Sequence, residues 1–251
     1  MKAKEILAKP LSPFFSFWFG LTLPLRSLGV ILNSPRLMVW SLFPITLTLA
    51  LYYYLIRHIQ TAAEAGITAY FNSLGWNPQG WGTLGLVILT KVLILVLGAF
   101  TFSAAAGILS SPFNDFLAEA AEPLATPPLP AVKAGTFSIR LRLIGIDILK
   151  TLFATALTWA SILVSWIPIL NLMALMMTFL LVCFQFISYP QTRRGEGIGP
   201  GVQFLFRHLF SCLGFGAAFT FLFAIPIVSS FAIPLAVVSG TLLYARAKPA
   251  Y

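Results

Sequence analysis

The sequence predicts an all-helical integral membrane protein, on the basis of its composition and its long uncharged runs. Of its 251 residues, 59% are hydrophobic and only 9% are charged, and the mean hydropathy is +0.91. A soluble domain carries about 25% charged residues, so water is an unsuitable solvent for this much apolar surface. Because a bilayer can take the place of water, we expect one helical membrane domain over residues 1–251.

The N-terminal segment, residues 1–36, is predicted to lie at the membrane surface. Aromatic and apolar side chains extend from Phe14 to Gly29, but Pro24 and Arg26 interrupt them. This pattern is typical of an interfacial amphipathic segment rather than of a span. No apolar stretch with a small-residue cleavage site follows the first lysines, so we expect no cleaved signal peptide.

Two full spans are predicted, at residues 37–57 and 84–111. The first carries no charge between Arg36 and Arg57 and has the length that ~30 Å of hydrocarbon requires. Lys91 interrupts the second, but a lysine near a helix end can extend its ammonium to the headgroups. Residues 65–83 contain asparagines and glycines, which favour a loop on the far side.

Two helical hairpins are predicted after the polar segment 112–150, at residues 151–189 and 208–245. Pro168 divides the first, whereas Pro226 and again Pro234 divide the second. Each arm before its first proline has about 16 to 18 residues, marginal for a crossing at ~1.5 Å per residue. We therefore expect two full transmembrane helices plus two Pro-broken, half-penetrating hairpins, with six full crossings as the alternative.

The charge distribution predicts both the orientation and the main partner. Lys and Arg number 16 against 7 for Asp and Glu, and the basic residues stand at the ends of the apolar runs. By the positive-inside rule, both termini and residues 112–150 and 189–207 are cytoplasmic, and residues 65–83 are periplasmic. Such scattered charge suits a lipid bilayer, so we expect no nucleic-acid partner.

Catalytic and metal-binding patterns are missing from the sequence. His58 and His208 are single histidines at span ends, without a cysteine or carboxylate at ligand spacing. Cys183 and Cys212 lie in apolar runs, where a thiol behaves as a small hydrophobe. No Ser-His-Asp set, nucleophile elbow or phosphate-binding loop occurs. We therefore expect no enzyme, no metal and no cofactor.

The most structured polar signal lies at residues 110–122. Asn114 or Asp115 can cap a helix start, and Asp115, Glu119 and Glu122 fall on one helical face. A capped, solvated helix is the simpler interpretation, and a polar lining at a pore mouth is the other.

A second set of polar residues is mainly basic. These residues can be interpreted as a vestibule that attracts anions or as charges that set the topology at the lipid surface, and the second interpretation is the simpler. The residues concerned are Arg140, Arg142, Asp147, Lys150, Arg193, Arg194 and Arg207.

Several short motifs from Pro35 onward occur in a distinctive order. They are Pro35, Pro44, Pro112-Phe113-Asn114, Leu117-Ala118-Glu119, Glu122, Tyr189-Pro190, Phe215-Gly216, Ile225-Pro226, Ile233-Pro234, Ala236-Val237 and Gly240-Thr241. With this order and spacing the chain resembles the CysZ-type sulfate permeases and the related etoposide-induced-protein family of membrane proteins.

The resemblance implies a bacterial inner-membrane protein with two spans and two pairs of half-penetrating helices. It also implies a homo-oligomer that lets sulfate enter for cysteine synthesis without nucleotide hydrolysis. Pore-lining or motif roles fall on Pro112, Phe113, Asn114, Glu119, Glu122, Tyr189 and Pro190.

One departure concerns the substrate. Directly after the position of Pro35, members of the family have a sequence similar to Gly-Leu/Ile-Arg-Arg, and the resemblance implies that its two arginines bind sulfate. Here the positions read Arg36, Leu37, Met38 and Val39. We therefore expect Arg36 to contact sulfate or a similar anion, and we keep a non-transporting membrane scaffold or membrane-shaping protein as the alternative.

Overall fold

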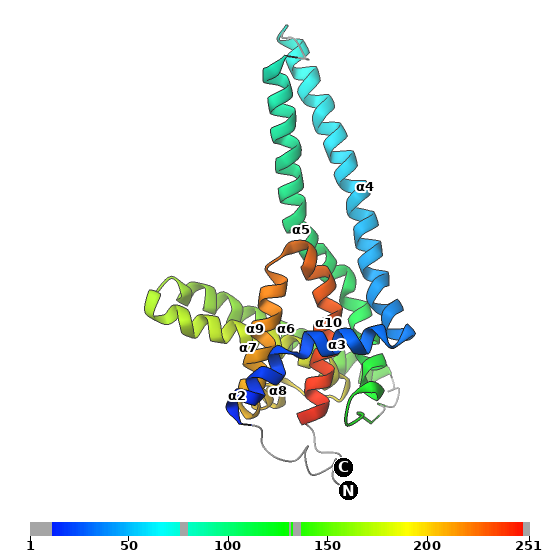
Figure 1. Cartoon of the computed structure of the whole chain (residues 1–251), viewed down its shortest axis with the longest axis vertical. Helices are drawn as coiled ribbons and strands as arrows, with labels where there is room; N and C mark the ends of the chain where they lie inside the picture. Colours follow the sequence, from blue (N-terminus) through cyan, green and yellow to red (C-terminus); the bar gives the residue numbers. More distant parts are fainter. Residues whose placement is uncertain (1–11, 76–79, 131, 133–136, 248–251) are drawn as a thin grey trace.

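The computed structural model describes residues 12–75, 80–130, 132 and 137–247, and every regular element in these ranges is a helix (Figure 1). For residues 99–100, 102–112, 137–141, 169 and 226–227 it describes the backbone only. The elements are α2 (Pro13–Leu21), α3 (Leu23–Leu32), α4 (Pro35–Ser73), α5 (Trp81–Ala121), η1 (Glu122–Leu124), α6 (Phe137–Ser165), α7 (Pro168–Arg193), α8 (Ile198–Arg207), α9 (Leu209–Phe223) and α10 (Pro226–Ala247). The all-helical prediction is confirmed.

Several helices have the length and composition of membrane spans. Five of the described helices qualify, and up to seven do if each of two bent pairs counts as one span. The pairs are α2 with α3, bent by 44°, and α8 with α9, bent by 98°. These features are those of a multi-pass membrane protein.

Helices α4 and α5 form a long antiparallel hairpin that projects from the body (Figure 1). They have 39 and 41 residues, so each is about 60 Å long, twice the hydrocarbon thickness. The loop predicted at 65–83 is therefore wrong for 65–73 and 81–83, because polar residues do not by themselves end a helix. Residues 76–79 lie outside the described part of the chain, as do 1–11 of the predicted interfacial segment and 131 and 133–136 of the predicted cytoplasmic segment.

Two features of this hairpin bear on the predicted spans. Lys91 forms an ion pair with Glu64 of α4, at 2.7 Å between Nζ and Oε2. Helix α5 also continues into the predicted polar segment, to Ala121. The stacked rings of Trp40 and Phe116, with centroids 5.0 Å apart, join the two helices near the body.

Prolines begin the second arms of both remaining hairpins. Pro168 is the first residue of α7 and Pro226 is the first residue of α10. Proline suits this position because its ring presets φ and its missing N–H would be unpaired anyway. Pro234 is different: it is buried inside α10, which continues through it, so the break predicted there is wrong. Packing of α10 on α3, α4, α5, α7 and α9 holds the helix across the lost hydrogen bond.

The core lies where α7, α9 and α10 meet, and small residues let their backbones approach closely. A Cβ added at Gly216 of α9 would overlap the carbonyl oxygen of Phe179 on α7. One added at Gly240 of α10 would lie 2.6 Å from the carbonyl oxygen of Phe186. The hydroxyl of Ser239 donates to that of Ser27 at 2.8 Å, which ties α10 to α3.

Replacement of Gly216 by alanine tests this close packing. We expect Gly216→Ala to destabilise the protein by ~1–3 kcal/mol, because the methyl group must push α9 away from α7. Gly29→Ala is the matched control: it lies in α3 with nothing near its Cβ position, and better helix propensity should give up to about 1 kcal/mol of stabilisation. Thermal unfolding in detergent measures both, and equal midpoints for the two variants would contradict the packing account.

Candidate functional site

A cavity of about 530 Å³ with a mixed polar and apolar lining lies between the end of α5 and the arms α6 and α7. Its polar side chains are Asn114, Asp115, Asp147, Lys150, Thr151, Thr155, Thr158, Thr178, Gln185, Ser188 and Tyr189. Its apolar side chains are Ala154, Trp159, Leu181, Val182, Phe184, Phe186 and Ile233. Only 9% of the chain is charged, so three charged residues in one cavity form an unusual concentration.

Helical periodicity explains the polar wall. Asp147, Thr151, Thr155 and Thr158 recur every three or four residues on α6, which places them on one face. Helix α7 has a similar stripe, because Thr178 and Gln185 are seven residues apart and residues 188–189 follow three and four residues later. Because the two arms pack against each other as antiparallel neighbours, both stripes border the same space.

Lys150 fixes one end of this wall. Its side chain is almost fully buried, with 2% of its surface exposed. The ammonium donates to Oε1 of Gln191 at 3.3 Å and to Oγ1 of Thr192 at 3.4 Å. These partners stand in the last turn of α7, where a cation is favoured by the helix dipole. Lys150 therefore anchors α6 to the end of α7 and still borders the cavity.

Two of the motif residues meet in the cavity wall. The Nδ2 atom of Asn114 donates to the hydroxyl oxygen of Tyr189 at 3.1 Å, which joins α5 to α7. Phe113 lies elsewhere, against the rings of Trp40 and Phe43 on the α4 side. Pro112 stands within α5, and its side chain is not among those described.

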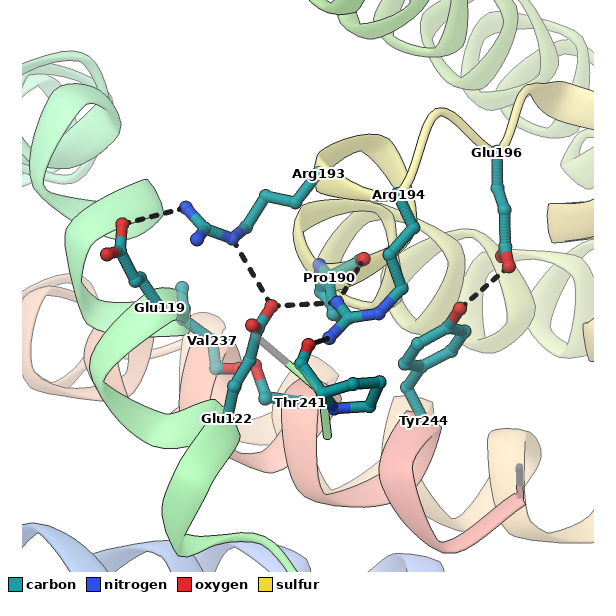
Figure 2. Close-up of polar contacts among 10 residues, drawn as sticks. Glu119, Glu122, Pro190, Arg193, Arg194, Glu196, Val237, Thr241 and Tyr244 are labelled. Carbon is teal, nitrogen blue, oxygen red and sulfur yellow. Dashed lines mark hydrogen bonds and ion pairs between the residues drawn. The ribbon is translucent and has the colours of Figure 1, made fainter. Parts of the chain in front are cut away.

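An arginine–glutamate network, made of Glu119, Glu122, Arg193 and Arg194, lies at the ends of α5 and α7 (Figure 2). Glu122 is buried, and its Oε1 accepts from Nε of Arg193 at 3.2 Å and from Nη1 of Arg194 at 2.8 Å. Arg193 also donates through Nη1 to Oε2 of Glu119 at 3.0 Å. The carboxylates of Glu119 and Glu122 thus offset the two neighbouring cations.

Backbone and ring contacts complete this network. Arg194 donates to the carbonyl oxygens of Pro190 at 2.8 Å and Pro130 at 3.1 Å. Its guanidinium lies 5.7 Å from the ring centroid of Tyr244, whose hydroxyl donates to Glu196 at 2.8 Å (Figure 2). The network therefore joins α5, α7, α10 and the segment after η1.

The structure separates the predicted site residues into groups. Glu119, Glu122 and Pro190 belong to the arginine–glutamate network rather than to the cavity lining. Arg193 and Arg194, considered for an anion vestibule, are paired with carboxylates. Of the other basic candidates, Arg142 and Arg207 are exposed, and the side chain of Arg140 lies outside those described.

Arg36 lies in the first turn of α4, exposed and outside the cavity lining. The threonine stripe of α6 and Gln185 of α7 were absent from the sequence prediction. The spacing of small polar residues inside an apolar run is the signal that points to such a stripe.

Removal of the Glu122 charge tests the network. We expect Glu122→Gln to destabilise the protein by about 3 kcal/mol, the low end for breaking a buried ion pair, because Arg193 keeps some contact with solvent. Glu64→Gln breaks the exposed pair with Lys91 and should cost at most ~1 kcal/mol. Unfolding midpoints in detergent measure both changes, and a Glu122→Gln effect no larger than that of Glu64→Gln would mean that the network contributes no stability.

Comparisons with known proteins give a consistent result. Residues 23–234 match the family model described as Sulfate transporter CysZ/Etoposide-induced protein 2.4. A Pseudomonas aeruginosa (strain LESB58) protein named sulfate transporter CysZ is 27% identical over 227 residues, which cover 86% of this chain and 90% of the relative. Relatives of the same name are each 26% identical, over 86% of this chain, and come from Pseudomonas paraeruginosa (90% of the relative) and Pseudomonas fluorescens strain Pf0-1 (89% of the relative).

Proposed function

The chain belongs to the family of the sulfate transporter CysZ and etoposide-induced protein 2.4, and from this membership we propose that it is an inner-membrane permease for sulfate or a similar small anion. The polar cavity between α5, α6 and α7 is the observation that carries the proposal. A polar cavity among membrane helices is costly and is typical of a solute pathway.

The chemistry of the cavity suits weak, reversible contact with an oxyanion. Lys150 supplies a positive charge, while Gln185, Thr151 and Thr155 supply neutral donors. Asp147, one turn before Lys150 on α6, and Asp115 of α5 also border the cavity, so two carboxylates oppose the attraction of Lys150 for an anion. Conduction requires binding that favours entry yet permits release, and one ammonium opposed by nearby carboxylates binds an anion only weakly. No nucleotide, metal or cofactor takes part, and the imported sulfate would supply cysteine synthesis.

For the membrane arrangement, we propose α4 and α5 as full spans and α6–α7 and α9–α10 as half-penetrating hairpins, with both termini cytoplasmic. Helix α9 has 15 residues, about 22 Å, too short to cross the hydrocarbon. Helices α6 and α7 are long enough, but their hairpin leaves the body sideways instead of running beside α4 and α5 (Figure 1). We also propose that the protein forms a homo-oligomer in the membrane.

Depth measurements test this arrangement. Spin labels at Leu172 and Ile225, both exposed near the hairpin turns, should lie near the middle of the bilayer. A label at Leu74, at the far end of α4, should lie at or beyond the opposite headgroups. Power-saturation measurements with oxygen and a nickel chelate give the depths, and hairpin labels as shallow as the Leu74 label would indicate full crossings instead.

The alternative function is a non-transporting scaffold or membrane-shaping protein. Large exposed side chains near the tip of α6–α7, Trp159, Leu163 and Trp166, favour it, because a hairpin of this kind can act as a wedge in one leaflet. Radiolabelled sulfate influx into proteoliposomes separates the two functions. We expect influx above that of empty vesicles, and no difference for folded protein would leave only the scaffold.

Replacement of Arg36 tests its predicted contact with the anion. Arg36→Ala should weaken sulfate binding by roughly 1.5–3 kcal/mol, the scale of a hydrogen bond to a charged group. Arg36→Lys should recover part of the loss, because lysine keeps the charge but not the planar donors. Arg57→Ala, at an exposed arginine further along α4, is the control. Calorimetric titration measures all three, and unchanged binding by Arg36→Ala would make Arg36 a headgroup anchor.

A further inference from the structure

Two arginines from opposite ends of the sequence, Arg26 and Arg246, contact the same aromatic ring. None of the residues involved lines the cavity. The guanidinium carbon of Arg26, on α3, lies 4.7 Å from the ring centroid of Phe19 on α2. That of Arg246, in the last turn of α10, lies 3.8 Å from the same centroid. Both distances fall in the cation–π range, so two positive charges are held as neighbours.

Within the described residues, neither charge has an ion pair with a carboxylate. In the described parts of the chain, the ion pairs involve Lys91, Arg193 and Arg194 as cations, and none includes Arg26 or Arg246. Like charges beside one ring repel each other, and the ring offsets only part of that repulsion. An oxyanion that contacts both guanidiniums would remove it. Guanidinium groups donate paired hydrogen bonds to phosphate and sulfate, which makes a tetrahedral oxyanion the matching ligand.

The side chains around the pair suit a membrane surface. Helices α2 and α3 expose the large apolar side chains Phe14, Phe15, Trp18, Leu25, Leu28 and Leu32. An apolar face beside basic residues lies at the boundary between headgroups and acyl chains. Free sulfate has the same oxyanion chemistry but no acyl chain to cover this face, whereas a phospholipid has both.

We propose that Arg26, Arg246 and Phe19 form a binding site for the phosphate of an anionic phospholipid. In the proposed topology the site faces the cytoplasmic leaflet, whose anionic lipids attract basic residues. The ring that carries both cations packs against the core, so the site is held in place before lipid binds. Helix α3 also packs against α10, and one bound lipid would therefore link the N-terminal helices to the last helix.

Native mass spectrometry of the full chain in detergent tests this site. The probes are phosphatidylglycerol, phosphatidylcholine and sodium sulfate, added separately and together. We expect phosphatidylglycerol to bind preferentially, and Arg26→Gln/Arg246→Gln to weaken that binding on the order of tenfold or more, the scale of one lost charge-assisted hydrogen bond. Arg57→Gln/Arg207→Gln, at two other exposed arginines, should bind like the unmodified protein.

Three results would overturn the proposal. The first is equal phosphatidylglycerol binding by the double variant and the unmodified protein. The second is equal binding of phosphatidylglycerol and phosphatidylcholine. The third is arginine-dependent binding of sulfate that displaces the lipid, which would assign the site to the free anion. If the double variant does not fold, Arg26→Gln alone provides the test, because Arg26 is exposed, and a several-fold loss is expected. Sulfate flux does not enter this experiment, so its outcome is independent of the permease proposal.

Discussion

The buried carboxylate of Glu122, which accepts from both Arg193 and Arg194, is the interaction on which the rest of the site depends. It fixes the end of α5 against the end of α7. Asn114 lies about two turns before Glu122, and Tyr189 lies one turn before Arg193. These two side chains form the next hydrogen bond between α5 and α7. Lys150 then joins α6 to the last turn of α7. Without the carboxylate, Arg194 would be left with backbone carbonyls and Arg193 with Glu119, and a poorly paired charge in a protein interior is costly.

This arrangement separates charges that stabilise from groups that can meet a solute. Arg193 and Arg194 are held by carboxylates, and Arg194 also by backbone carbonyls, so they act as structural anchors. The cavity itself presents hydroxyl and amide groups with one ammonium and two carboxylates. Close packing at Gly216 and Gly240 keeps α7 fixed against α9 and α10, which supports the wall from behind. A polar wall on rigid helices suits a pathway that must hold its shape in hydrocarbon.

The sequence predicts the helical class and the hairpin turns well, because both rest on local signals. Uncharged runs identify membrane helices, and Pro168 and Pro226 start second arms because proline suits a first helical position. Local signals fail where tertiary contacts decide. Polar residues 65–73 remain helical because α5 lies alongside, and Pro234 is carried within α10 by packing on several helices. Glu122 and Arg193 lie far apart in sequence, so no periodicity shows that each is the partner of the other. Their pairing changes a possible vestibule into a structural network.

In the proposed permease, the anion passes through the cavity between α5, α6 and α7. The most direct measurement is sulfate influx through a Thr155→Cys variant before and after reaction with a bulky maleimide, with Cys183 and Cys212 replaced by alanine. Thr155 lines the cavity and is exposed, whereas Thr61, an exposed threonine on α4, provides the control. If the anion passes through this cavity, the reagent abolishes influx through Thr155→Cys and leaves influx through Thr61→Cys unchanged. Complete labelling of Thr155→Cys without loss of influx would contradict it.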